Sequence, residues 1–575
     1  MDANSGAMSP NTALPYDQKG EKYHKQYHDF LVGNHSVPLG GGGEFEYFWD
    51  YYHGIVNPQR DHNHVIRSAS GALFPVDFIN YNHLLGFGEV LIGELLKNKQ
   101  VVNTKALSPT ALARKRKKMA EFDVDFKLMP LYIEDEQTYG LPVITDQMAL
   151  SESDLAYKKE NYKEEGEKVY GRLAKYYQNK YRWKAMKGRL MEDLIVTARC
   201  FLESQMTPHG PRMFYRDPRT VIFDESTKSP WLEDTSFIGT VEYMPITQVV
   251  ETYGIDPHTA KELREENTND EGMRIGGGLA PYKTKDSNRA EMVLVSRVQW
   301  KDFAYKTGVG YEDKMGREHW HIKQPGTKIK KKGLKEEKKI PYQIVRTCTV
   351  VAGKHVVEWG ELKNQVRSGD DWQRTGFTIQ GFLPRWKNGR SVSIIQQLIP
   401  LQKLFDQSMY HIRLAFKKDR GKAFIGDMAA LPRGYDIKDQ AYYGQVLGII
   451  PIDSSTRGLG GMQYNQFQTV DMSLSPSTSI YIQVAQMALT EMERITGISP
   501  ARQGVPEAPT QAVGVMDMSR KQSMLRTERF FSGFDVFTEM FFELVLGQYK
   551  IQLQYDDHGL ANVIGDEGMS FIQND

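Results

Sequence analysis

Cysteine is scarce in this sequence, which contains only Cys200 and Cys348 among 575 residues. Two cysteines so far apart provide neither a disulfide framework nor a cysteine-based zinc module. Long apolar runs are also missing, since the best candidate, 541–547, falls far short of the roughly 18 residues that a membrane span needs. No basic segment followed by an apolar stretch begins the chain, so no secretory signal is indicated. These absences predict a protein that is soluble and intracellular when synthesised.

An excess of charge of either sign is absent as well. Lys and Arg number 73 against 72 Asp and Glu, which gives a formal net charge of +1. Strong overall basicity of the kind that coats nucleic acid is therefore excluded, while local basic patches remain open. Charged residues make up 25% and hydrophobic residues 40% of the chain, so most of it should fold. At roughly 150 residues per domain, the length suffices for three or four domains.

Motifs of known enzyme classes are also lacking. Glycine-rich stretches at 40–43, 276–278 and 458–461 do not form the GxxxxGK[ST] pattern of a phosphate-binding loop. No GxSxG motif accompanies a serine nucleophile. In the sequence DHNH, His62 and His64 would share a face only on a strand, and surface histidines are the favoured interpretation. The sequence therefore predicts no catalytic residue, no metal site and no cofactor.

One pair of carboxylates leaves an enzymatic alternative open. In EFDVDF, Asp123 and Asp125 alternate as on a strand and would point the same way. Such a pair can hold Mg²⁺ for phosphoryl transfer, which would suit a metal-dependent DNA-processing enzyme. No other segment supplies the further carboxylates that a two-metal site needs, and acidic strand edges also commonly prevent aggregation.

Hydrophobic periodicity divides the chain into helical and strand-rich parts. Residues 84–96 repeat with a period near 3.6 and predict a buried helix, and 153–206 predict a helical tract of two helices. Strand patterns then dominate at 212–223, 292–300, 342–351 and 356–359. From 391 to 550 the sequence becomes mostly helical again.

The C-terminal half contains three long helical patterns. Apolar residues over 394–416 follow one face of a helix, which Pro400 must start, kink or interrupt. A Ser-Pro pair at 475–476 predicts a helix start, and Gly497 its end. The aromatic stripe at 530–544 could supply part of a subunit interface, although packing within the chain is the commoner use of such rings.

A basic cluster closes the first of these helices, where it could contact DNA. Its members are Lys417, Lys418, Arg420 and Lys422. Cations also suit a helix C-terminus because of the helix dipole, so the structural explanation is equally favoured.

Several degenerate motifs follow one another in a fixed order. The first is HGPRMFYRDPRTVIFDE, with Gly210, Asp217, Pro218, Arg219 and Asp224. It is followed by VEYMPITQVVETYG at 241–254, by a long helical segment at 393–425 and by a proline-rich stretch at 495–515. The last motif is IGDEGMSFIQND at the C-terminus. In order and spacing this chain resembles the portal proteins of tailed bacteriophages, from about residue 150 to 575. The resemblance rests on the order of the motifs more than on any one of them.

The resemblance implies an α+β fold with a mixed α/β wing, two long stem helices, a small clip and a long channel helix. The expected divisions are an N-terminal arm and extra region of unknown role (1–150), the wing (151–392), stem helix 1 (393–420), the clip (421–474), stem helix 2 (475–497), the tunnel loop (498–513), and the channel/wing helix with a returning strand (514–575). The crown that many portals carry after this strand would be short or absent.

By the same resemblance, the chain would form a ring of roughly twelve subunits, a dodecamer, at one vertex of the capsid. Double-stranded DNA would be packaged and ejected through this ring. The implied partners are the terminase large subunit, head-tail adaptor proteins and the major capsid protein. The protein would be structural rather than an enzyme, found in the virion after assembly in the host cytoplasm, and without a membrane partner.

A duplex that moves through a pore should be held weakly, because each phosphate neutralised by Lys or Arg adds affinity. Arg502 and Gln503 are the candidates for transient phosphate contacts in the tunnel loop, and Pro506 would limit its collapse. The prolines of this stretch, Pro506 among them, could instead merely separate two helices. Two other functions remain as alternatives, namely the DNA-processing enzyme at Asp123 and Asp125 and a capsid or tail structural protein without a channel.

Overall fold

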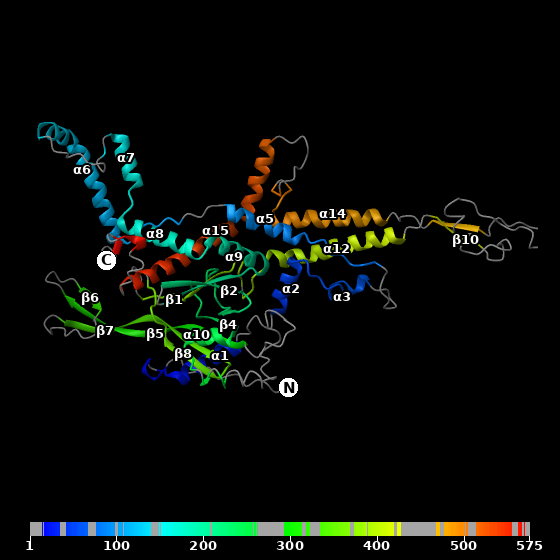
Figure 1. The fold of residues 1–575 in the computed structure, drawn as a ribbon, viewed down its shortest axis with the longest axis horizontal. Coiled ribbons are helices and arrows are strands. Elements are labelled where there is room, and N and C mark those ends of the chain that lie inside the picture. Colours follow the sequence, from blue (N-terminus) through cyan, green and yellow to red (C-terminus); the bar gives the residue numbers. More distant parts are fainter. Residues whose placement is uncertain are drawn as a thin grey trace, which may run out of the picture. The chain divides into compact units, whose positions relative to one another are not determined.

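In the computed structural model, the chain folds into two compact units. Each unit is made of stretches that are not consecutive in the sequence. The first unit comprises residues 1–47, 88–393 and 525–575, and the second comprises 48–87 and 394–524. The structure describes residues 14, 16–34, 42–66, 76–97, 102–106, 108–139, 149, 151–207, 210–256, 258–259, 261–262, 292–312, 318–322, 334–367, 373–387, 389–418, 422–426, 467–471, 477–500, 502–503, 513–554, 562–565 and 568–569. Helices and strands both occur, so the predicted α+β class is confirmed (Figure 1).

Helices precede most of the strands in sequence. They are η1 (Tyr16–Gln18), α1 (Glu21–Asn34), α2 (Gly42–Tyr52), α3 (Pro58–Asp61), α4 (Asn63–Ile66), α5 (Leu84–Lys97), α6 (Pro109–Tyr139), α7 (Glu152–Asn161), α8 (Glu165–Lys180) and α9 (Trp183–Thr197). The helix predicted over 84–96 is confirmed as α5, whose Leu84, Leu91 and Leu95 are buried. Across the helices that the structure describes, none combines the length and hydropathy needed to cross a bilayer.

The helical tract predicted over 153–206 differs from the structure in two ways. It contains three helices rather than two, because the chain turns between α8 and α9 at Arg182, which adopts a left-handed backbone with φ of 49°. A new helix also begins after Glu164, whose amide donates to Glu167 Oε2 at 3.1 Å. From Cys200 onward the tract is not helical, since these residues form a strand paired on both sides.

The first unit contains two antiparallel sheets. The three-stranded sheet has the order β2 (Gly210–Arg216), β1 (Cys200–Thr207) and β9 (Ile379–Phe382). The larger sheet has the order β3 (Val221–Phe223), β4 (Phe237–Pro245), β5 (Met292–Glu312), β7 (Leu334–Val351) and β8 (His355–Glu361), with β6 (Glu318–Ile322) paired to β5; α10 (Ile246–Tyr253) follows β4. The strands predicted at 292–300, 342–351 and 356–359 are confirmed.

The strand predicted over 212–223 is divided between the two sheets by a turn at the DPR motif. Thr220 N donates to Asp217 O at 2.9 Å, and the Arg219 guanidinium donates to the Asp217 carboxylate at 2.7 Å. Gly210 begins β2 with φ of 99°, and a Cβ there would lie 2.5 Å from the Gln552 side chain. The motif that carries the resemblance therefore has a local structural role, since it sets the turn between β2 and β3 and lets Gln552 approach closely.

Helix α1 covers the larger sheet, with Leu31 packed in a core that includes Phe237 and Trp300 (Figure 1). Lys19, which the sequence places in an N-terminal arm, is buried and pairs with Asp302 at 2.7 Å. Residues 1–13 of that arm lie outside the described residues.

Three histidines of the N-terminal region are not the surface residues that the sequence predicts, whereas His53 is exposed as predicted. His24, His28 and His62 are all buried. His62 stacks on Phe78 with ring centroids 4.4 Å apart, and it lies next to helix α4 rather than on a strand. Burial lowers the pKa of His24, so its ring is neutral at pH 7. Packing among aromatic side chains accounts for His24 and His62, while His28 contacts the Asp29 carboxylate at 3.0 Å.

Two long helices, α12 (Ile394–Lys418) and α14 (Ser477–Thr496), lie side by side in the second unit (Figure 1). Pro400 lies inside α12, so it does not start that helix. As predicted, α14 ends at Gly497, which has φ of 71°. Strands β10 (Lys422–Gly426) and β11 (Phe467–Asp471) pair between the two helices in sequence, and α15 (Val513–Gln554) follows. The Ser-Pro pair at 475–476 lies outside the described residues.

Three polar side chains of α12 hold the extended segment 76–83. Gln402 Nε2 donates to Tyr81 O at 2.8 Å, and Asp406 Oδ1 accepts from Tyr81 N at 3.1 Å. Arg413 donates to the carbonyl of Asp77 at 2.9 Å. These bonds satisfy backbone groups that the extended segment cannot pair by itself.

The C-terminal motif predicted as a returning strand is different in the structure. The described residues 562–564 and 568–569 are helical, and Met569 N donates to Gly565 O at 3.1 Å. Arg172 of α8 donates to Ile564 O at 2.9 Å, which fixes this segment against α8. Residues 570–575 lie outside the described residues.

Candidate nucleic-acid interface

Arg502 joins α14 to α15 instead of lying on an exposed loop. It is 7% exposed, and its NH1 donates to the carbonyls of Gly497 and Ser523, each at 3.3 Å. The Ser523 hydroxyl also donates to Gly497 O. Because the carbonyl of Gly497, directly after α14, and that of Ser523, within α15, hold this guanidinium, it is not placed to contact a phosphate. The sequence-based prediction for Arg502 differs from the structure in this respect.

Of the other tunnel-loop candidates, the structure describes Gln503, whose backbone N donates to Ser499 O at 3.2 Å. Gln503 is exposed, directly after Arg502. Pro506 lies outside the described residues, as do residues 504–512 around it. A phosphate contact by Gln503 and a stiffening effect of Pro506 therefore stay predictions.

The basic cluster predicted at the end of the first long helix straddles the end of α12. Lys417 is exposed, and Lys418 is the last residue of the helix. Lys422 begins β10, and Arg420 lies outside the described residues. The cluster therefore sits at a helix C-terminus, where the helix dipole favours cations whether or not DNA is bound.

The carboxylate pair considered for metal binding lies on a helix, not on a strand. Asp123 and Asp125 belong to α6, where residues two positions apart point in nearly opposite directions. Asp123 forms an ion pair with Lys159 of α7. Within the part of the chain that the structure describes, no group of three or more His, Cys, Asp or Glu residues could hold a metal ion.

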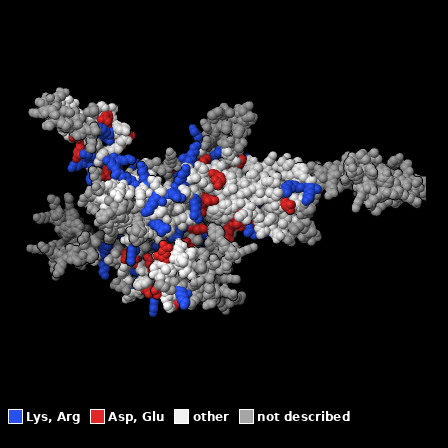
Figure 2. Space-filling model, viewed as in Figure 1, with Lys and Arg blue, Asp and Glu red and all other residues white. Residues whose placement is uncertain are grey.

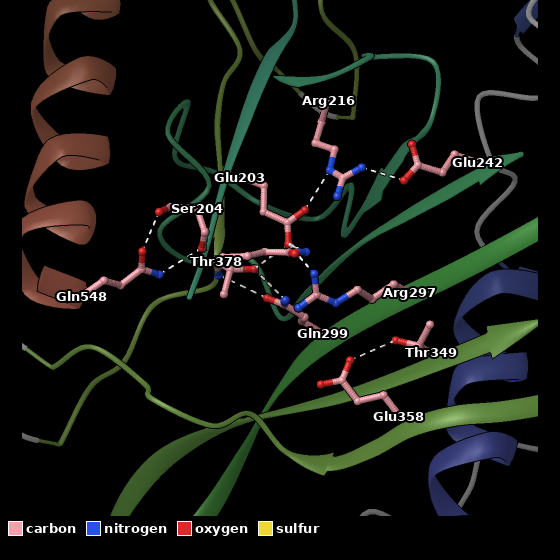
Figure 3. A network of polar contacts seen from close by, with 11 residues as sticks. Glu203, Ser204, Arg216, Glu242, Arg297, Gln299, Thr349, Glu358, Thr378 and Gln548 are labelled. Atoms are coloured by element: carbon pink, nitrogen blue, oxygen red, sulfur yellow. Dashed lines mark hydrogen bonds and ion pairs between the residues drawn. The ribbon is translucent and has the colours of Figure 1, made fainter. Parts of the chain in front are cut away.

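A buried polar network joins the two sheets of the first unit (Figure 3). Glu203 of β1 is fully buried and accepts from Arg216 of β2 at 2.7 Å and from Arg297 of β5 at 2.5 Å. Thr378, which lies beside β9, donates to the same carboxylate at 3.1 Å, and Arg216 also pairs with Glu242 of β4 at 2.6 Å. The Glu203 carboxylate thus connects β1, β2 and β5 directly, and Arg216 extends the network to β4.

The charges in this network compensate one another. Burial alone would raise the pKa of Glu203, but Arg297 and Arg216 hold that pKa down to about 2. The network extends to α15, where Gln548 Nε2 donates to Ser204 O at 2.9 Å (Figure 3). The sequence analysis missed Glu203, although an isolated acidic residue inside the apolar strand FLESQM is a recognisable signal of a buried partner.

Comparison with known proteins decides among the functions considered. The profile of the phage P22-like portal protein family matches residues 160–572, which is most of the chain. The chain belongs to this portal protein family. It is also 22% identical over 311 residues to the portal protein of Bacteroides phage crAss001. That match covers 52% of this chain and 38% of the crAss001 portal protein, so the chain matches well under half the length of its relative.

Membership of the portal family confirms the resemblance on which the sequence analysis relied. The matched residues begin at 160 and contain both sheets, α12, α14 and α15. Asp123 and Asp125, on which the alternative of a metal-dependent enzyme depends, lie outside the matched range. Portal proteins are structural components of the virion, so the enzymatic alternative is not favoured.

Proposed function

We propose that this chain is one subunit of a ring-shaped portal at a single capsid vertex of a tailed phage. Double-stranded DNA passes through the ring during packaging and again during ejection. The observation that carries this proposal is the match to the phage P22-like portal family over 160–572. The long helices and the β-strand pair between them support it, because they occur in the order that the resemblance implies.

As part of this proposal, we assign elements of the structure to the predicted divisions. Helix α12 serves as stem helix 1, the pair β10 and β11 belongs to the clip, and α14 serves as stem helix 2. Helix α15, with 42 residues, serves as the channel helix, and the two sheets form the wing. The terminase large subunit and the head-tail adaptor proteins dock on the clip, and the major capsid protein surrounds the ring. Assembly takes place in the host cytoplasm.

Apolar side chains on α14 support contact between subunits. Ile480 is 58% exposed and Met487 is 54% exposed, and their spacing of seven residues places them on one face of the helix. In a ring, each subunit presents such a face to a different face of its neighbour, a heterologous contact that closes on itself. Burying these two side chains would stabilise the ring, here taken as a dodecamer.

Replacing both residues by lysine is expected to disrupt the ring. The variant Ile480→Lys/Met487→Lys should shift the protein from a ring to smaller species, because charged side chains are costly at a buried contact. A matched control is Val124→Lys/Leu131→Lys on α6, which has the same spacing and exposed fractions of 53% and 56%. Mass determination on both variants compares them directly, and equal effects would count against α14 as a subunit contact.

Electron microscopy of the purified full-length protein, with its mass measured on the same sample, tests the proposed function. Rings with an axial hole and roughly a dozen subunits would support it. Closed oligomers without a hole would favour a capsid or tail structural protein that forms no channel, and would refute the proposal.

The tunnel loop is tested separately from ring formation. Gln503→Ala and Pro506→Gly are expected to leave ring assembly intact and to reduce the yield of packaged DNA. Arg502→Ala should instead weaken the junction between α14 and α15, because it removes the bonds to the Gly497 and Ser523 carbonyls. An unchanged packaged-genome length and yield for the first two variants would refute the tunnel-loop assignment.

A further inference from the structure

A basic face on α8 forms one wall of a cleft in the first unit. Lys168, Arg172 and Lys175 are spaced by four and three residues, so they lie on the same side of the helix, and all three are exposed. The cleft has a volume of about 330 Å³. Its lining comprises Val102, Asn103, Thr104, Lys163, Glu167, Lys168, Gly171, Arg172 and Lys175. Its volume lies at the lower end of the range for small-ligand sites.

The charge of this lining is strongly unbalanced. Four of the nine lining residues are cationic, and the single carboxylate belongs to Glu167. That carboxylate is already occupied: its Oε1 accepts from Ala106 N at 2.8 Å and from Lys115 Nζ at 3.0 Å, and its Oε2 accepts from Glu164 N at 3.1 Å. It therefore helps to build the wall of the cleft and does not neutralise the cations within it.

The cations keep donors for a ligand. Among the described residues, Lys163, Lys168 and Lys175 have no ion pair or hydrogen-bond partner for their ammonium groups. Arg172 donates one bond to Ile564 O at 2.9 Å, which fixes the guanidinium and leaves its other N–H groups available. Gly171 has no side chain, and a Cβ there would lie 3.2 Å from Thr104 Oγ1, so the glycine lets α8 approach this lining residue closely.

The basic surface continues beyond the cleft. Lys180, Arg182 and Lys184 are exposed at the end of α8 and the start of α9. Figure 2 shows Lys and Arg gathered over this part of the molecule, with few acidic side chains among them. Like charges so close together repel one another and contribute nothing to the core, so an anionic ligand gives them a role.

We propose that the cleft on α8 binds phosphate groups, supplied either by the backbone of a nucleic acid or by a small polyphosphate. A fixed guanidinium can form two parallel bonds to one phosphate, while the lysines act as mobile point charges around it. Asn103, another lining residue, is exposed and can donate from its amide. This proposal does not depend on the formation of a ring.

The test measures binding of the full-length protein to inorganic tripolyphosphate and, separately, to a short DNA duplex over a series of salt concentrations. The variant Lys168→Gln/Arg172→Gln/Lys175→Gln is compared with Lys228→Gln/Lys363→Gln/Lys387→Gln, which removes the same charge from exposed lysines elsewhere in the first unit. Arg172 also holds the Ile564 carbonyl, so its loss could disturb the local structure. A second variant, Lys168→Glu/Lys175→Glu, therefore leaves Arg172 in place. Lys168→Arg/Lys175→Arg keeps the charge and should keep binding.

The two cleft variants that remove positive charge should bind at least tenfold more weakly than wild type, whereas the arginine variant and the control should not. For the duplex, removing three phosphate contacts should also lower the slope of log K against log salt concentration by about 2 to 3. Loss of tripolyphosphate binding alone identifies a small polyphosphate as the source, and loss of duplex binding alone identifies a nucleic acid. No binding by wild type, or equal losses in the cleft and control variants, would overturn the proposal.

Discussion

Replacing Asp406 by asparagine is expected to remove a specific part of the pH dependence of stability. Asp406 lies in the middle of α12 and is fully buried. Its Oδ1 accepts from Tyr81 N and from Gln402 Nε2, each at 3.1 Å, while its Oδ2 is buried without a hydrogen-bond partner. Burial raises the pKa of Asp406 from 3.8 to about 7, although these two hydrogen bonds act in the opposite direction. Burial lowers the pKa of the nearby His83, which favours its neutral form.

The sign follows from comparing the folded and unfolded chains. A pKa near 7 in the folded state means that the folded chain holds this proton where the unfolded chain has lost it. The resulting stability is fully present below pH 3.8 and is lost as the pH rises to about 7. The whole effect corresponds to about 4 kcal/mol, of which about 2.5 kcal/mol falls between pH 5 and pH 8.

Asparagine resembles the protonated acid in shape and does not titrate. It keeps the acceptor for Tyr81 and Gln402 and places its amide nitrogen where Oδ2 now lies. Compared with wild type, Asp406→Asn should therefore gain about 2.5 kcal/mol in the free energy of unfolding between pH 5 and pH 8. Asp77→Asn, at an exposed carboxyl in the same unit, serves as the control.

Urea unfolding of the three proteins at several pH values measures this difference. Circular dichroism follows the loss of helix, and the slopes must agree among the proteins for the free energies to be compared. If wild type and Asp406→Asn show the same pH dependence, the raised pKa and the argument from burial are both wrong.

Two further predictions concern the first unit. Glu203→Gln should lower the free energy of unfolding by about 3 to 5 kcal/mol, because Arg216 and Arg297 would stay buried without their carboxylate. Thermal melting measures this, with Glu121→Gln on α6, whose side chain is 45% exposed, as the control. Equal melting temperatures of the two variants would contradict the prediction. Cys200 and Cys348 should not react with a thiol reagent in the native protein, because burial raises the pKa of Cys200 well above its ordinary value and that of Cys348 to about 12. Rapid labelling before denaturant is added would show that the thiols are accessible.

The sequence predicted the elements whose periodicity is long. The stripe over 394–416 identified α12 in spite of Pro400, because burying a whole apolar face outweighs the roughly 3 kcal/mol that an internal proline costs. The six residues EFDVDF were misinterpreted as a strand because their alternation is too short to decide against a long flanking sequence of good helix formers.

The candidate site was less predictable because burial depends on distant parts of the chain. Arg502 lies in a proline-rich stretch that gives no sign of the two carbonyls that receive its guanidinium. Glu203 meets Arg297 only because β1 and β5 approach each other in the folded unit. The sequence analysis missed the basic face of α8, and the hydrogen bonds that occupy Glu167 became evident only from the structure.

The second unit is assembled from two stretches separated by about 300 residues of chain. At about 5 to 20 residues per second, a ribosome takes roughly 15 to 60 seconds to add that much polypeptide. During that time residues 76–83 have been synthesised, while the α12 side chains that hold their backbone have not. The first half of this unit must therefore wait, with its backbone groups bonded to water, until α12 leaves the ribosome. The order of synthesis thus makes the docking of 76–83 on α12 a late step in the folding of each subunit.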